Sequence, residues 1–564
     1  MNHDHTRRLD EYRLNHAGPL ENDLIDVFAD GGMDRQEFIK RATVLGLSVG
    51  AIGAAVGALD TPLAFGAPAA RKVGGRIRVG ITPPPTKEIE PHTFADQGGL
   101  ETGGIAGEFL TRATQSLTLK SELALSWKPN KAASEWTFTI RKNVKFANGA
   151  LFTADDVVTT FKRLTDPNSG SQALSAFKGV LSPSGITKVD DYTVKFTLDA
   201  PTASFPYLTS STTYQAIILP KDYKLGTFTA TPQTTGAFKL TSYTPGVSAK
   251  YDRNTSWWGG QSPLEGVDVT YYADEAAMIA GLLGGQIDLC NQVQFATGRA
   301  VFNNSKVQIF STRGATHREI CLRVNLKNPI KSNLVRQAMA LTLDRPSIVK
   351  KLFNGFADIG NDSPFAPVYP STNKSVPQRH KDIAKAKQLM SQAGYPKGFA
   401  IKLTTEKTGE IPQLAQIFQS GVKQIGINMS LEILTSTAYF AGTQTGPPTG
   451  YGNTPWLNAP VSITDWGHRA VPNVLLTAAV ASGGVWNGAQ YKNKALDAII
   501  KKYLGAIALS DQRKYAGQIE TIMLRDTPII FPYFYNYIAA GSKSVKGYQA
   551  DALGQVYLSH TSLA

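Results

Sequence analysis

The segment Ile463-Thr464-Asp465-Trp466-Gly467-His468-Arg469 is the stretch around which the rest of the chain is organised. It holds an acid, a large aromatic ring, a glycine, an imidazole and a guanidinium, and Pro460 and Pro472 flank it. This content is typical of a strand end that runs into a loop, where recognition residues tend to lie on a rigid scaffold. We therefore predict that the segment faces a small solute. The alternative is a surface loop with a half-buried tryptophan.

The composition is that of a soluble protein with more than one domain. At 564 residues the chain is too long for one ordinary core, and its 42% apolar and 18% charged residues are normal for globular proteins. The formal net charge is +14; residues 1–70 hold six basic and ten acidic residues, a net of −4, so the remainder carries +18. Because the lysines and arginines are scattered, we expect no nucleic-acid partner.

The two cysteines, Cys290 and Cys321, lie neither in a Cys-x-x-Cys pair nor near a histidine, which argues against zinc. They are either two buried thiols or, in an exported protein, one disulfide. Each lies in or at the end of a strand-like run, so we favour the disulfide.

The first seventy residues predict an export signal. Residues 1–32 are polar and acidic, and we expect them to be disordered. The basic stretch 34–41, the charge-free run 44–59 and the small residues 64–70 then follow in the order of a secretory signal. The apolar run is short and glycine-rich for a membrane span, which needs about 20 apolar residues. A membrane-anchoring or amphipathic helix is the alternative.

The export route stays open. The pattern Arg-x-x-Phe-Ile-Lys at 35–40 resembles the twin-arginine signal, but Gln36 stands in the place of its second arginine. No cysteine follows the apolar run, so we expect no lipid anchor there. The mature chain is expected to be soluble outside the cytoplasmic membrane.

Periodicity predicts the elements of the remaining chain. Strands are expected at 76–81, 135–141, 192–198, 234–240, 250–254, 287–290, 318–326, 401–405, 429–434 and 529–537. Helices are expected at 105–117, 278–283, 334–342, 347–353, 383–393, 412–424, 495–503 and 511–524, and one begins after an N-cap at Thr153. Loops are expected at 91–94 and 439–460. The alternation after residue 318 predicts an α/β lobe with a mixed or parallel sheet.

Motifs for catalysis are not found. The chain lacks His-Glu-x-x-His, the phosphate-binding loop and Gly-x-Gly-x-x-Gly, and its one Gly-x-Ser-x-Gly match, at 46–50, lies inside the export signal. The five histidines after residue 70 lie far apart: His92, His317, His380, His468 and His560. We predict a protein that is not an enzyme and that has no cofactor or bound metal. A secreted hydrolase is one alternative.

Six groups of residues, in order along 76–540, carry a resemblance to a known family. They are Trp136–Arg141 with Phe146–Gly149 and Thr153–Val157; Thr235–Leu240; Arg253-Asn254 before Trp257-Trp258; Gly285–Asp288; Val335–Ala338 with Leu343–Arg345; and Ala384–Leu389 with Ala393–Pro396. Together they resemble the extracellular solute-binding proteins, family 5, which are peptide- and nickel-type receptors of bacterial ABC importers.

The resemblance implies an α/β, two-lobed, periplasmic-binding-protein-like clamshell (type II, cluster C) with an additional small α+β domain. Lobe I would comprise 71–107, 225–322 and 532–564, the accessory domain 108–224 and lobe II 323–531. The hinge would lie near Arg323 and Phe531. Solute would stabilise the closed state by hinge closure.

The resemblance also implies a receptor that captures a peptide or similar small solute and delivers it to a membrane permease, with the receptor monomeric and periplasmic. A sensory ligand-binding module is a further alternative. Peptide-binding members of the family often carry an aspartate just after the tryptophan of the opening segment, which holds the peptide amine. Here the only acid, Asp465, precedes Trp466, so this anchor is shifted or absent. An opine, a charged sugar or a chelated metal are therefore further ligand candidates.

The candidate ligand contacts combine this resemblance with the chemistry of the side chains. Trp466 offers a stacking face, and Arg469 suits a carboxylate or phosphate through paired hydrogen bonds. The full set of predicted contacts is Asp465, Trp466, Gly467, His468, Arg469, Trp486, Asn487, Tyr491, His92 and Phe94.

Overall fold

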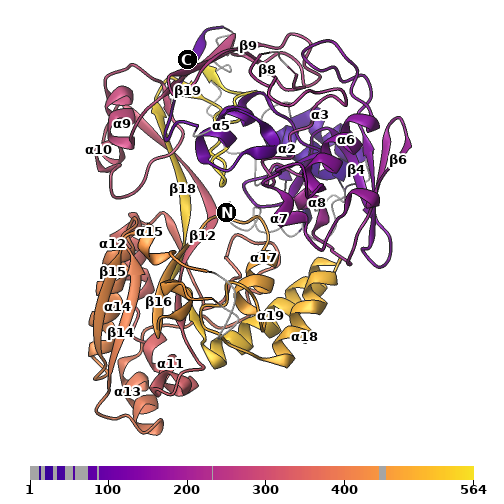
Figure 1. Cartoon of the computed structure of the whole chain (residues 1–564). Helices are drawn as coiled ribbons and strands as arrows, with labels where there is room; N and C mark the ends of the chain where they lie inside the picture. The colour runs from indigo at the N-terminus through magenta and orange to yellow at the C-terminus, as the bar shows by residue number, and fades with distance from the viewer. Residues whose placement is uncertain are drawn as a thin grey trace.

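The computed structural model describes residues 74–85, 88–230, 233–443 and 452–564, together with parts of the stretch 12–56. Two bodies lie one above the other in Figure 1 and are joined by two long strands, β12 (Val307–Leu322) and β18 (Tyr533–Ser542). We refer to them as the upper and the lower lobe. The two-lobed α/β architecture predicted from the sequence is confirmed.

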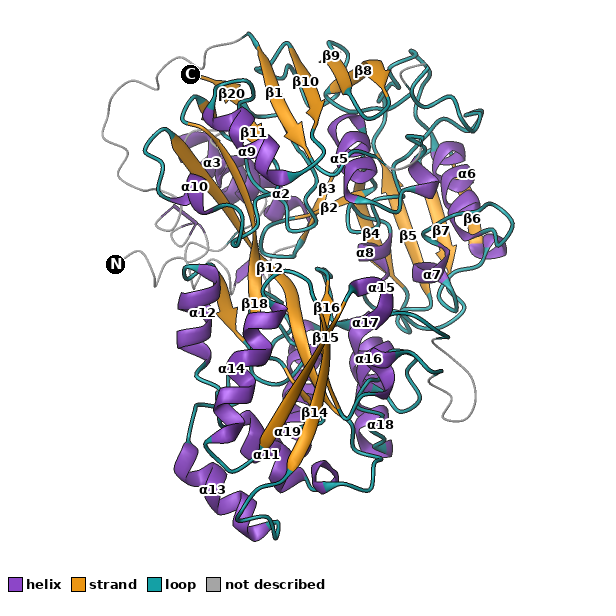
Figure 2. Ribbon diagram, turned by 60° about the vertical axis from the view of Figure 1, so that its left-hand side comes forward, coloured by secondary structure: helices purple, strands orange, loops and turns teal. Residues whose placement is uncertain are grey.

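One sheet passes through both lobes. Its strand order is β15-β14-β16-β12-β18-β11-β1-β10-β9-β8, with β13 and β17 paired at its side. Strands β8 to β11 and β1 lie in the upper lobe, and β14 to β16 lie in the lower lobe (Figure 2). The mixed sheet predicted for the lower lobe is present, because β14 pairs in parallel with β15 and β16, whereas β16 is antiparallel to β12.

The two crossing strands are irregular where they pass between the lobes. The register of β12 against β18 shifts between Thr312 and Thr316. Gly314 lies inside this irregularity, and a Cβ there would be 3.2 Å from the backbone oxygen of Tyr535. The predicted hinge residues Arg323 and Phe531 lie just beyond the lower end of the crossing pair. The division into lobes and the hinge position stay predictions.

The main apolar core of the upper lobe extends through the predicted accessory domain, and a second, smaller cluster packs against α9. Its main-sheet strands are β1 (Arg76–Ile81), β8 (Phe238–Thr244), β9 (Ser248–Arg253), β10 (Gly266–Tyr271) and β11 (Leu289–Cys290). Its helices are α5 (Gln97–Ala106), α9 (Glu275–Leu283) and α10 (Arg299–Phe302). Two short strands, β19 (Val545–Lys546) and β20 (Ser562–Leu563), pair near the end of the chain.

The accessory region is built on a four-stranded sheet of order β4-β5-β7-β6. Its elements are β2 (Thr111–Ala113), β3 (Leu119–Ser121), β4 (Ala124–Pro129), β5 (Glu135–Ile140), β6 (Ile186–Asp190), β7 (Thr193–Thr197), α6 (Ala154–Thr165), α7 (Leu174–Phe177) and α8 (Phe205–Leu208). The predicted N-cap at Thr153 is confirmed: Asp156 accepts from the Thr153 backbone N–H at 2.7 Å, which completes a capping box.

The lower lobe packs helices on its part of the sheet. The helices are α11 (Asn333–Ala340), α12 (Arg345–Phe353), α13 (Ile383–Gln392), α14 (Ile411–Lys423), α15 (Ser436–Tyr439), α16 (Pro455–Asn458), α17 (Asn473–Leu475), α18 (Lys494–Gly505) and α19 (Leu509–Asp526). The strands are β13 (Ala357–Ile359), β14 (Ala400–Glu406), β15 (Asn428–Leu434), β16 (Val461–Trp466) and β17 (Ile529–Ile530). A π-helical turn, Leu476–Val480, follows α17.

The predicted helix at 105–117 is wrong. The helix of this region, α5, lies earlier in the chain, where Asp96 caps its N-terminus by accepting from the Gly99 N–H at 2.8 Å. Glycine has a low helix propensity, and α5 contains four glycines, so propensity alone did not predict a helix here. Residues after Ala106 instead enter strand β2, with Phe109 and Leu110 fully buried.

Other boundaries also differ from the sequence predictions. Residues 91–93 form a 3-10 turn, and the predicted loop at 439–460 contains α16, while its residues 444–451 lie outside the described part of the chain. The strand expected at 318–326 begins at Val307 and ends at Leu322. The strand expected at 529–537 is divided into β17 and β18 at Pro532, which has no N–H to donate to a ladder.

The predicted disulfide is also wrong, because Cys290 and Cys321 are both free and buried. Cys290 packs beneath α9 with Met278 in the upper lobe, whereas Cys321 belongs to a core cluster of the lower lobe with Phe531. Strand-like surroundings do not bring two cysteines within bonding distance, since disulfides need Cα atoms about 4.4–6.8 Å apart.

The N-terminal stretch contains two helices, α2 (Pro19–Ala29) and α3 (Arg35–Val44). Residues 1–32 are therefore not uniformly disordered, because Leu24 and Ile25 pack in one cluster with Phe38. Most of the predicted export signal after Val44, including 60–70, lies outside the described residues. Among the described residues, we find no helix with the length and apolar character to cross a membrane.

Candidate functional site

A cleft of about 520 Å³ lies between the two lobes, and the crossing strands also line it. The upper lobe contributes Asp96 and Gln97 at the start of α5, Tyr214, and the segment 292–296 with Arg299. The crossing strands contribute Thr316, Arg318 and the run Tyr535–Ile538. The lower lobe contributes 351–354 at the end of α12, 408–410 and the opening segment at Asp465 and 467–469. Its volume falls within the range of small-molecule sites, about 300–1,000 Å³.

The strand β16 decides which residues of the opening segment face the cleft. Successive side chains of a strand point to opposite faces of the sheet. Asp465 is exposed towards the cleft, whereas Trp466, its neighbour, is buried on the other face. Trp466 packs there against Trp456 and Trp486, with ring centroids 6.2 and 5.3 Å away. The acid and the aromatic ring therefore cannot both line the cleft.

Asp465 is held by Arg318, its direct cross-strand neighbour on β12. Arg318 is almost fully buried, and its guanidinium also lies 3.0 Å from Glu410. Glu410 in turn accepts from the Tyr533 hydroxyl at 2.7 Å, and the Tyr535 ring lies 5.0 Å from the Arg318 guanidinium carbon. Both carboxylates are therefore engaged by a buried cation on the floor of the cleft.

His468 connects the opening segment to the irregular part of β12. Its Nδ1 accepts a hydrogen bond from the Ala315 N–H at 3.0 Å, next to Gly314. Burial, together with the charge of Arg469, lowers the pKa of His468 to about 3. The ring is therefore neutral at physiological pH and carries its proton on Nε2, because Nδ1 acts as the acceptor.

Arg469 is exposed at the cleft, and its Nη1 donates to the neighbouring carbonyl of His468 at 2.8 Å. Gly467 also lines the cleft. Four of the predicted contacts, Asp465, Gly467, His468 and Arg469, are thus brought together at one wall.

The remaining predicted contacts do not line this cleft. Asn487 is buried and holds its own loop through hydrogen bonds with Tyr491, whose hydroxyl donates to Asp526. His92 lies 3.2 Å from Glu90, and Phe94 belongs to the upper core. Trp486 packs against Trp466 in the apolar cluster described above.

Several cleft residues were not predicted from the sequence. They are Asp96, Gln97, Arg299, Arg318, Lys351, Glu410, Tyr535 and Tyr537. They come from six separate stretches of the chain, and no local motif marks any of them. The aromatic-rich run at 529–537 is the one available signal, and by itself it indicates a buried strand rather than a cleft wall.

A buried carboxyl supports the α5 wall. Glu101 is about 1% exposed and accepts from Gln97 Nε2 at 2.6 Å. Burial raises the pKa of Glu101 to about 8 from an ordinary value of 4.5. The folded protein therefore binds a proton more tightly than the unfolded chain between these pH values. The resulting stabilisation is complete below pH 4.5 and is lost as the pH rises through about 8.

We expect Glu101→Gln to flatten this part of the pH profile. Between the two pKa values the parent loses about 1.4 kcal/mol of unfolding free energy for each pH unit, and the variant does not. The difference in unfolding free energy, variant minus parent, should therefore be larger at pH 9 than at pH 5. Urea unfolding at both pH values measures the difference. Glu88→Gln, at an exposed position, is the control. A profile of Glu101→Gln parallel to that of the parent would contradict the role of this carboxyl.

Comparison with known proteins identifies the family. The model of the bacterial extracellular solute-binding proteins, family 5 (Middle), matches residues 118–483, well over half of the chain. The chain belongs to this family. The resemblance stated from the sequence is therefore confirmed, as is the role of a substrate-binding receptor of ABC transport. The family and the relatives compared are binding proteins rather than enzymes.

The relatives and the solved structures agree with this assignment. Heme-binding protein A of Haemophilus influenzae is 26% identical over 467 residues, which is 78% of this chain and 83% of that protein. The oligopeptide-binding protein AppA of Bacillus subtilis is 26% identical over 518 residues, 86% and 90% of the two chains. The structure of HbpA2 from Haemophilus parasuis superposes with a TM-score of 0.76 at 22% identity and covers 87% of this chain and all of that one, which supports the same fold.

Proposed function

We propose that this family 5 protein is an exported, monomeric receptor that encloses a small solute between its two lobes and delivers it to the permease of an ABC importer. The observation that supports this most directly is the cleft itself, because both lobes and both crossing strands line it. A solute bound there contacts both lobes only when they approach, so it stabilises the closed state by differential contacts. We propose Asp465, Gly467, His468 and Arg469 as the wall that faces it.

The proposed place of action is outside the cytoplasmic membrane. The order of a basic stretch, an apolar run and small residues before Arg76 supports export, and the family is extracytoplasmic by description. The relatives are named for heme and for oligopeptides, so the ligand of this chain is small, organic and within the size of the cleft. Binding without turnover is part of the proposal.

Native mass spectrometry of the purified protein tests this function. We expect a complex that loses one small solute on activation, and addition of that solute to stripped protein should reduce the radius of gyration in small-angle scattering. Release of a chemically altered solute would contradict a receptor and indicate an enzyme. An unchanged radius of gyration at saturation would contradict closure.

A further inference from the structure

Three cations line the cleft without a carboxylate partner in the described part of the chain: Arg299, Lys351 and Arg469. All three are exposed side chains. Arg299 begins α10, Lys351 lies in the last turn of α12, and Arg469 follows β16. The three cations come from separate elements, so their grouping at the cleft is not the result of one helix terminus or of one basic stretch of sequence.

The carboxylates of the same cleft are already engaged. Asp465 and Glu410 hold the buried Arg318, and Asp96 caps α5. The lining thus contains four guanidinium or ammonium groups and three carboxylates, and the excess charge is positive. A free ligand amine would have to compete with Arg318 for Asp465, whereas an anion finds three cations with open donors.

Because these cations lie on opposite lobes, the free energy of closure depends on the charge of whatever is bound between them. Helix α10, with Arg299, lies above the gap between the lobes, and α12, with Lys351, lies below it (Figures 1 and 2). Closure brings these like charges closer in a medium of lower dielectric, which raises their repulsion. An anion between them reverses the sign of this contribution, so charge neutralisation becomes part of the free energy that favours the closed state.

We propose that the ligand of this cleft is a small polyanion, with at least two carboxylate or phosphate groups, that bridges Arg299 of the upper lobe to Lys351 and Arg469 of the lower lobe. The inference rests on the proposed function. Guanidinium groups bind carboxylate and phosphate through paired, charge-assisted hydrogen bonds, and lysine adds a point charge. Tyr535 and Tyr537 on the crossing strands offer aromatic surface for an organic body between the anionic ends.

The test uses the full chain after ligand removal and pairs of probes in which the anionic groups of one member are blocked or missing in the other. Citrate is compared with its trimethyl ester, and fructose 1,6-bisphosphate with fructose. Pyrophosphate and the zwitterion trialanine are tested as well. We expect the melting temperature to rise with polyanions and not with the matched neutral compounds. Citrate alone would indicate a carboxylate ligand, and the phosphates alone a phosphate ligand. Stabilisation by trialanine or the neutral probes, without any polyanion effect, would overturn the proposal.

Single variants locate the contacts. Arg299→Gln, Lys351→Gln and Arg469→Gln should each weaken binding of the effective polyanion at least about tenfold, as loss of a charge-assisted contact predicts. Lys350→Gln changes the same charge on the same helix but lies outside the cleft lining, so it should leave the affinity unchanged. Equal affinities of all four variants would contradict the bridge. If no probe binds and the protein as purified carries no solute, the proposed receptor function itself fails.

Discussion

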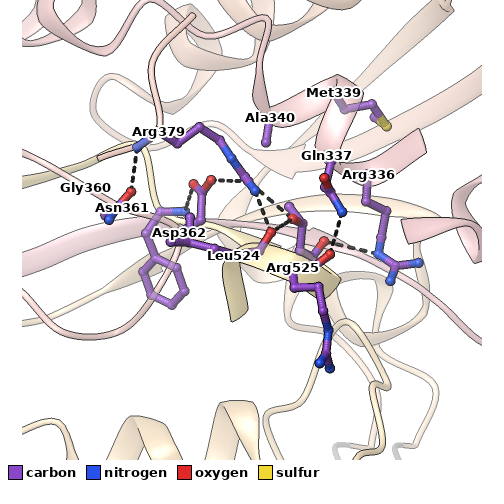
Figure 3. A network of polar contacts seen from close by, with 12 residues as sticks. Arg336, Gln337, Met339, Ala340, Gly360, Asn361, Asp362, Arg379, Leu524 and Arg525 are labelled. Atoms are coloured by element: carbon purple, nitrogen blue, oxygen red, sulfur yellow. Dashed lines mark hydrogen bonds and ion pairs between the residues drawn. The ribbon is translucent and has the colours of Figure 1, made fainter. Parts of the chain in front are cut away.

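Asp362→Asn is expected to destabilise the lower lobe by about 3–5 kcal/mol, because it leaves two buried guanidinium groups without their counter-charge. Asp362 is completely buried and bonds Arg345 at 2.7 Å and Arg379 at 2.6 Å. Figure 3 shows Arg379 beside this carboxylate. Asp362 also accepts from the Phe531 N–H at 3.2 Å, which ties the group to the lower end of the crossing strands.

Asparagine is the informative substitution at this position. Asp362 has a φ of 52°, in the left-handed region, which asparagine tolerates better than most residues. The change therefore removes the charge without adding backbone strain or a cavity. Urea unfolding, monitored by tryptophan fluorescence, measures the loss of stability.

An exposed pair of the same chemistry is the control. Asp252 lies 2.7 Å from Arg76, with 57% and 33% of the two side chains exposed, and Arg76 keeps a second partner in Asp268. Asp252→Asn should change stability by less than about 1 kcal/mol. An equally small loss of unfolding free energy in Asp362→Asn would contradict the expectation that the buried ion cluster stabilises the lower lobe.

The buried cluster also shows what the sequence could reveal. Arg345 lies in a segment that carried the family resemblance, so its importance had a local signal. Its partner Asp362 lies 17 residues away, and Phe531 is far downstream. Partners that meet only through the tertiary fold leave no periodic pattern.

The elements themselves were largely predictable because periodicity reports burial. Strands β1 and β5 and helices α13 and α14 were predicted within a residue or two of their bounds. The errors arose where another signal dominated. The glycine-rich α5 was missed because its formation depends on the Asp96 cap and on packing rather than on propensity.

The site was predicted at the level of the segment but not of each side chain. The composition of the segment indicated that 465–469 forms part of the cleft wall. Composition does not determine which face of a strand each side chain occupies. The alternation of side chains along a strand, applied to 461–466, is the rule that separates Asp465 from Trp466. The net charge of the cleft could not be predicted from the sequence, because its cations come from elements far apart in the chain.

Trp466→Ala is therefore expected to lower stability far more than ligand affinity. Trp466 is about 8% exposed and lies between Trp456 and Trp486 in an apolar cluster that also contains Tyr439 and Leu475. Truncation of a buried tryptophan leaves a large cavity and costs about 3–5 kcal/mol. Urea unfolding should show this loss, and Trp466→Phe, which keeps an aromatic ring in place, should recover most of it.

Affinity at a temperature where the variant is fully folded separates the two roles of the opening segment. Arg469→Gln should show the opposite pattern to Trp466→Ala, with unchanged stability and weakened binding, because Arg469 is exposed at the cleft. A strong loss of affinity in Trp466→Ala with unaltered unfolding would mean that the ring reaches the ligand. The paired outcome follows from where the two side chains lie: Trp466, the last residue of β16, is buried in an apolar cluster, whereas Arg469, in the loop after the strand, is exposed at the cleft.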